Sequence, residues 1–102
     1  MDKNQRNSEA IPNPRAIRRA CGRELYRTAK RLNARIPAEK MKTAVEIYFR
    51  KMIPKLIWIY ENRNNRKVLA DWWEQEVGPE IAQLWEVKPE ELARAFRSAF
   101  GG

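Results

Sequence analysis

The sequence predicts an all-α protein, a small bundle of four or five helices that begins with a basic amphipathic helix. Two observations support this fold class. Apolar residues recur at intervals of three and four along most of the chain, which is the spacing of one face of an α-helix. No segment alternates convincingly between apolar and polar residues with the period of two that a β-strand shows. The length of 102 residues predicts one domain with a single modest core.

A row of arginines marks the first predicted helix. The arginines stand four residues apart, at Arg15, Arg19, Arg23, Arg27, Arg31 and Arg35. Side chains at this spacing share one face of a helix, and the row follows about 30 Å of helix as a slow spiral. Neighbouring arginines repel one another by about 0.2 to 0.5 kcal/mol per pair. An anionic partner is therefore expected to offset this repulsion.

The opposite face of the same segment is apolar, as in a helix that packs against the rest of the protein. It carries Ile17, Cys21, Leu25, Ala29, Leu32 and Ile36. Asn13 is a suitable N-cap, and Pro14 fits the first helical position. Pro37 disfavours helical geometry at the residue before it. We therefore expect a helix over residues 14–35, within an arginine-rich segment of residues 13–36.

The rest of the chain, residues 37–102, is expected to complete the bundle. The apolar spacing and the positions of proline and glycine predict further helices over about 37–60, 68–77, 79–86 and 89–100. Pro54 interrupts the first of these, so we expect a kink or a short break there. Residues 56–60 taken alone could also form a strand. Residues 1–12 are polar and are expected to form an arm that is flexible or ordered by a partner.

Charge is unevenly distributed along the chain, whose formal net charge is +8. Residues 1–36 hold 10 basic and 3 acidic residues, residues 37–70 hold 8 and 3, and residues 71–102 hold 3 and 7. Strong positive charge predicts a partner such as nucleic acid, an anionic membrane surface or an acidic protein. The acidic last third adds a second copy of this chain to these candidates.

Residues suited to catalysis are scarce. The chain has no histidine and one cysteine, so the usual acid-base residue, the nucleophilic dyads and nearly all zinc sites are missing. Its four glycines form no phosphate-binding loop. We therefore expect a protein that is not an enzyme, with no catalytic site, metal site, cofactor or small-molecule substrate. Cys21 belongs to the apolar face of its helix, which predicts a buried thiol.

The apolar segments do not indicate a membrane protein. None is long enough to cross a bilayer, and the N-terminus has no apolar signal region. The apolar face of the first helix has small residues and no tryptophan or phenylalanine anchor, so binding to a membrane surface is disfavoured. The expected location is inside the cell, or in a virion, without secretion by a signal peptide.

The composition of the arginine row favours a polyanionic partner over simple solvation. All six positions are arginine, whose planar guanidinium binds phosphate or carboxylate as a fork. Glu24 is the only acid from Pro14 to Pro37. We predict contacts to the backbone of nucleic acid, with duplex DNA favoured. The predicted interface comprises Arg15, Arg18, Arg19, Arg23, Arg27, Lys30, Arg31, Arg35, Arg50, Lys51 and Lys55.

Several large aromatic residues lie in the acidic last third. Packing explains them better than base stacking does, because a nucleic-acid backbone would be repelled there. The residues predicted to pack the bundle and to join subunits are Trp72, Trp73, Trp85, Phe96 and Phe100. Residues 81–96 have roughly the apolar spacing of a helix-turn-helix. Glu90 and Glu91 would then stand where base and phosphate contacts belong, so a regulator of this kind is the third hypothesis.

The short all-α chain, its arginine face and its acidic opposite end together resemble the small helical coat proteins that wrap DNA in filamentous archaeal viruses. The resemblance is one of general design and implies basic helices that line nucleic acid and other helices that pack against neighbouring subunits. The first hypothesis is a non-enzymatic, multi-copy protein that coats or compacts duplex nucleic acid. The second is a small helical interaction subunit whose basic helix docks on an acidic surface, of its own kind or of a larger complex.

Overall fold

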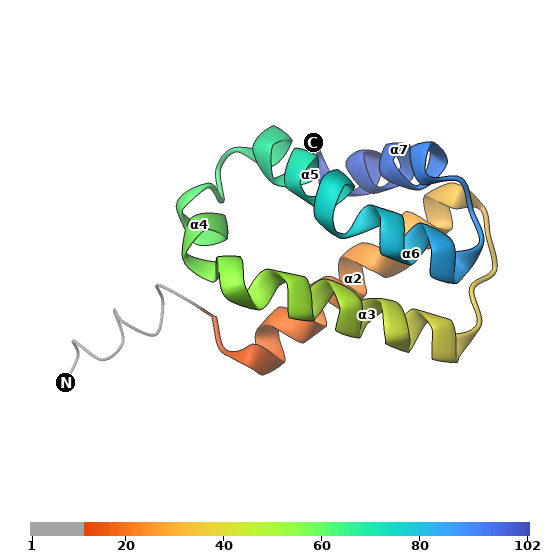
Figure 1. Ribbon diagram of the computed structural model, residues 1–102, viewed down its shortest axis with the longest axis horizontal. Helices are drawn as coiled ribbons and strands as arrows, with labels where there is room; N and C mark the ends of the chain where they lie inside the picture. Colours follow the sequence, from red (N-terminus) through yellow and green to blue (C-terminus); the bar gives the residue numbers. More distant parts are fainter. Residues whose placement is uncertain (1–11) are drawn as a thin grey trace.

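The computed structural model describes residues 12–102, and in this part of the chain every regular element is helical. The elements are α2 (Pro14–Leu32), α3 (Ala38–Met52), the 3-10 turn η1 (Ile53–Lys55), α4 (Leu56–Glu61), α5 (Arg66–Glu76), α6 (Gly78–Trp85) and α7 (Pro89–Phe100) (Figure 1). The all-α prediction is confirmed. Apart from Pro12, the predicted arm of residues 1–12 lies outside the described residues.

Helix α2 begins where the sequence predicted but ends earlier. The side chain of Asn13 accepts a hydrogen bond from the backbone N–H of Ala16 at 2.8 Å, which caps the first turn. At the other end, Asn33 adopts a left-handed conformation with φ of 57°, and its N–H reaches the last turn of the helix. The prediction that this helix continues to Arg35 was therefore wrong. Arg35 lies in the connection between α2 and α3.

The predicted kink at Pro54 is present. Proline has no backbone N–H, and the chain passes through η1 between α3 and α4. The alternative of a strand over residues 56–60 was wrong, because these residues form most of α4. With α3, η1 and α4 counted as one kinked helix, the described residues form a bundle of five helices.

The core lies where α2 packs against both α3 and α7, with α5 and α6 closing the bundle (Figure 1). The ring of Trp73 stacks on Phe96 with centroids 3.8 Å apart, and Tyr48 meets both rings edge-on. The aromatic core therefore joins α3, α5 and α7. Among residues 12–102, no helix combines the length and the apolar character needed to cross a membrane.

The aromatic residues predicted to join subunits divide into two groups. Trp73, Trp85 and Phe96 are fully or almost fully buried inside this chain, where they pack the bundle. Their predicted part in subunit contacts stays a prediction. The indole N–H of Trp85 donates to the backbone carbonyl of Lys40 at 3.2 Å, which further ties it to its own chain. Trp72 and Phe100 are only partly buried.

Candidate nucleic-acid interface

Helix α2 presents five arginines of the row to solvent because its apolar side is held in the core. Ile17, Cys21, Leu25 and Ala29 are buried, as their position on the opposite face predicted. One of them, Arg31, donates to Ser98 of α7, and the other four are Arg15, Arg19, Arg23 and Arg27. On an α-helix these four positions span about 18 Å of axis and turn through about 120°. They form one continuous surface, which we call the α2 arginine face.

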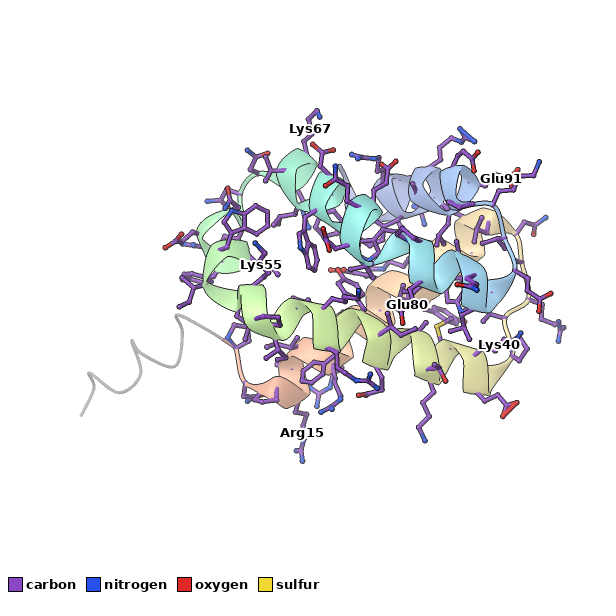
Figure 2. The ribbon with its side chains drawn as sticks, viewed as in Figure 1. Arg15, Lys40, Lys55, Lys67, Glu80 and Glu91 are labelled. Carbon is purple, nitrogen blue, oxygen red and sulfur yellow. The ribbon has the colours of Figure 1, made fainter. Side chains whose placement is uncertain are left out.

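The α2 arginine face has no charge partner within the described part of the chain. No ion pair between residues 12–102 includes any of its four arginines. Arg15 extends from the start of the helix away from the bundle in Figure 2. The repulsion between neighbouring arginines is therefore not relieved by acids from the helices packed beside α2.

Two cations of the predicted interface have other roles. The guanidinium of Arg18 binds the carboxylate of Glu46 with Nε–Oε2 at 2.7 Å and Nη2–Oε1 at 3.2 Å, and its Cζ lies 4.0 Å from the ring centroid of Phe49. This hydrogen-bonded pair lowers the pKa of Glu46 below its ordinary value. Arg18 thus joins α2 to α3. Lys51 lies 3.5 Å from Glu80 and joins α3 to α6.

The remaining predicted cations lie on several elements. Lys30 is exposed on α2, and the Nε of Arg31 donates to the hydroxyl of Ser98 in α7 at 3.1 Å. Arg50 and Lys55 are exposed on α3 and η1, and Arg35 is exposed in the preceding connection. The structure therefore brings together the four arginines and Lys30, all on one helix. Lys51 of α3 does not add to this cationic surface, because it is paired with Glu80.

Tyr26 is an exposed aromatic residue on α2 that the sequence analysis overlooked. It is 58% exposed, and the ammonium of Lys30 lies 5.1 Å from its ring centroid. Its position, three residues after Arg23 and four before Lys30, places it beside the α2 arginine face. The sequence contains a signal that could have identified Tyr26, namely an aromatic residue at an outward position of a cationic helix. Such a ring can stack on a base or a sugar.

Within residues 12–102 Glu24 forms no ion pair with the α2 arginine face, although the charges of Arg23 and Arg27 act on its carboxylate. Its carboxylate accepts a hydrogen bond from the hydroxyl of Tyr48 at 2.5 Å, on the side of α2 that packs against α3. Burial raises the pKa of Glu24 above its ordinary value. The only acid from Pro14 to Pro37 is therefore turned inward, which leaves the outer surface of α2 free of carboxylates.

Most acids of the last third are engaged within the chain. The guanidinium of Arg97 binds Asp71 at 2.6 Å and Glu74 at 2.8 Å, and so joins α7 to α5. Lys40 lies 3.5 Å from Glu86, and Lys51 lies 3.5 Å from Glu80. The acidic residues without ion pairs among residues 12–102 in this third are Glu76, Glu90 and Glu91. The last third is therefore a weaker docking surface for a second copy than its composition predicts.

Comparison of the chain with protein-family models, with curated proteins and with solved structures gave no match. The resemblance to small coat proteins of filamentous viruses stays a prediction.

Proposed function

We propose that this protein is a non-enzymatic nucleic-acid-binding protein that coats or compacts duplex nucleic acid as a multi-copy assembly. In this proposal the basic amphipathic helix α2 lies along the phosphate backbone. The observation that carries it is the α2 arginine face, whose four guanidinium groups are exposed and without acidic partners among residues 12–102.

The chemistry of these groups fits phosphate. Guanidinium is planar, permanently charged and less strongly hydrated than the ammonium of lysine, and it binds phosphate oxygens through two parallel N–H donors. Phosphate contacts position a protein on the duplex without reading its sequence. A protein that coats many base pairs needs binding that does not depend on the base sequence. Tyr26 adds a ring that can pack on sugar or base beside the phosphates.

Two other functions remain as alternatives. An interaction subunit would dock α2 on an acidic protein surface, either of another protein or of a second copy of this chain. Docking on a second copy is weakened, because four acids of its last third already bind cations of their own chain: Asp71, Glu74, Glu80 and Glu86. A helix-turn-helix regulator would use α6 and α7. The first turn of α7 carries two carboxylates that repel phosphate. Both alternatives therefore rank below a backbone-binding protein.

The proposal is tested by titrating a fluorescent duplex of about 30 base pairs and following its anisotropy at moderate salt. The test variant replaces Arg19, Arg23 and Arg27 by glutamine. We expect binding of the wild-type protein, and a loss of affinity of at least about tenfold in the variant, because three phosphate contacts disappear. Electron microscopy of the same mixtures should show uniform filaments or compacted particles with the wild-type protein only.

A matched control removes the same charge elsewhere. Lys42, Lys88 and Arg94 are exposed cations outside α2, and among residues 12–102 none of them forms an ion pair. Their triple replacement by glutamine should change the affinity less than threefold or so, since long-range charge alone is screened at moderate salt. Equal losses in the two variants would show that net charge, rather than the α2 arginine face, governs binding. Salt-sensitive self-association without any binding of nucleic acid would favour the interaction subunit.

A further inference from the structure

Helix α4 is apolar nearly all the way round, yet the structure buries none of its residues. Residues 56–60 are five consecutive apolar residues, and neither α4 nor the preceding turn η1 contains a buried side chain. Within residues 12–102, α4 has few contacts with any element except the adjoining η1. It lies at one end of the molecule, between α3 and α5 (Figure 1). The proposed function does not use this end of the bundle.

The outer side of α4 and η1 is an apolar patch. Ile57 is 64% exposed, and Ile53, one turn earlier, is 42% exposed. Pro54 and Trp58 line the same surface hollow as these two residues. We call Ile53, Pro54, Ile57 and Trp58 the α4 patch. Among residues 12–102, Tyr26 is the only other large apolar residue with comparable exposure. Exposed apolar side chains that gather in this way are typical of an interaction surface.

Opposite charges stand at the two ends of the α4 patch. Lys55 and Glu61 are exposed, line the same hollow and form no ion pair among residues 12–102. The ammonium of Lys55 lies 5.3 Å from the ring centroid of Trp58, which keeps it beside the patch. Lys55 precedes Trp58 by three residues, and Glu61 follows it by three. The two charges are therefore placed symmetrically about Trp58 along the chain.

This symmetry makes the α4 patch complementary to itself. A two-fold axis brings the same surface of two copies together, and two-fold dimers are the commonest homo-oligomers. If the axis passes near Trp58 and the two α4 helices run antiparallel, Lys55 of each copy lies beside Glu61 of the other. The apolar side chains then meet between the two ion pairs. We propose that the α4 patch is a contact between two copies of this chain, paired in this antiparallel arrangement.

The contact is small, which predicts weak and reversible self-association. Residues 53–61 are nine residues, whereas a stable interface uses about 20 to 30 residues and about 800 Å² of each partner. The net charge of +8 on each copy also opposes association. On a duplex, phosphate neutralises this charge, and binding to one polymer raises the effective concentration of the copies. A dimer then presents two α2 arginine faces to the duplex. This last step alone rests on the proposed function.

An anionic membrane fits the α4 patch less well than a second copy does. Arg50 and Lys55 are exposed and would attract lipid phosphate, and tryptophan is enriched at membrane surfaces. Glu61, however, follows Ile57 by four residues, so it shares the face of α4 that would approach the lipid. A membrane would repel this carboxylate, whereas a second copy supplies a cation for it.

Sedimentation equilibrium of the full chain without nucleic acid tests the proposal. At protein concentrations up to about 1 mM and moderate salt, we expect a monomer–dimer equilibrium with a Kd of about 10 μM to 1 mM. Ile57→Ser should weaken the dimer at least about tenfold, because it removes the most exposed large apolar side chain of residues 12–102 from the centre of the contact. Tyr26→Ser is the matched control. It changes a similarly exposed side chain on α2 and should leave the Kd unchanged.

Exchange of the two charges tests the antiparallel pairing itself. Lys55→Glu brings two acids together at each end of the contact, and Glu61→Lys brings two cations together there. Either variant should weaken the dimer at least about threefold, because two-fold symmetry makes each pair occur twice. The double variant Lys55→Glu/Glu61→Lys restores opposite charges and should recover the wild-type Kd. Both side chains are exposed, so we expect all three variants to fold.

The proposal is overturned if the wild-type protein stays monomeric at the highest of these concentrations, or if Ile57→Ser and Tyr26→Ser change the Kd equally. It is also overturned if the double exchange does not recover what each single exchange loses. A monomer that binds vesicles of phosphatidylcholine and phosphatidylserine, and loses this binding in Ile57→Ser, would assign the α4 patch to a membrane instead. These measurements contain no nucleic acid, so their outcome is separable from that of the proposed function. A monomer that still binds duplex through the α2 arginine face would refute the dimer contact alone.

Discussion

Replacement of Leu25 by alanine tests the orientation of α2, on which the exposure of its arginines depends. Leu25 has no exposed surface and lies at the middle of the buried face of the helix. The adjacent residue, Tyr26, lies about 100° further round the helix and is 58% exposed. Two consecutive residues therefore report on the two faces of one helix turn.

The expected cost of Leu25→Ala follows from complete burial. Removal of a buried leucine side chain destabilises a protein by about 2 to 5 kcal/mol, through the lost transfer free energy and the cavity that remains. Leu25 belongs to the core that α2 shares with α3 and α7, so we expect a value near the middle of this range, about 3 kcal/mol. For a chain of this size that value corresponds to a decrease in Tm of about 12 to 24 °C.

Tyr26→Ala is the matched control. An exposed substitution away from caps and ion pairs changes the free energy of unfolding by about 0.5 kcal/mol or less. Chemical denaturation followed by tryptophan fluorescence measures both variants, and an unchanged m-value shows that the difference is one of stability. A cost below about 1 kcal/mol for Leu25→Ala, or equal costs for both variants, would mean that α2 does not pack through the face described here.

Three further predictions concern the ends and the interior of the helices. Asn13→Ala removes the side-chain acceptor of the Ala16 N–H and should lower the free energy of unfolding by about 0.5 to 2 kcal/mol, whereas Asn13→Ser should restore most of it. Burial raises the pKa of Cys21 from 9.0 to about 12, so at pH near 8 the native thiol should react with a disulfide reagent about 1,000-fold more slowly than the thiol of the unfolded chain. Fast reaction in the native protein would place Cys21 at the surface. Hydrogen bonds from Arg97 lower the pKa of Asp71, whose stabilising effect is therefore present above the ordinary pKa of 3.8 and lost as the pH falls below it. Arg97→Gln should make Tm less dependent on pH in this acidic range, and an unchanged pH profile would contradict the pairing.

The helices were predictable because their signals are local. Periodic apolar residues, the cap at Asn13 and the proline at position 54 act within one or two turns, and the structure has the helices and the kink that they predict. The end of α2 was missed although its signal is also local. The apolar spacing continues to Ile36, while Asn33 can adopt the left-handed conformation that ends the helix. The apolar periodicity alone does not show whether the helix continues to Ile36 or ends at Asn33.

The composition of the candidate sites depended on contacts between distant residues. Arg18 is paired because Glu46, 28 residues later, lies beside it in the folded chain. Trp73 and Phe96 became core residues because α5 packs against α7. Glu24 is turned inward because Tyr48, 24 residues later, donates a hydrogen bond to it. A single sequence does not reveal such pairings, because residue type and spacing describe one helix at a time.

The central claim is that α2 meets phosphate, and the salt dependence of duplex binding tests it most directly. Five contacts, from Arg15, Arg19, Arg23, Arg27 and Lys30, predict a slope of about −4.5 in a plot of log affinity against log salt concentration. The Arg19, Arg23 and Arg27 variant retains two of these contacts and should give a slope of about −2. A wild-type slope shallower than about −2, or the same slope for both proteins, would contradict the claim.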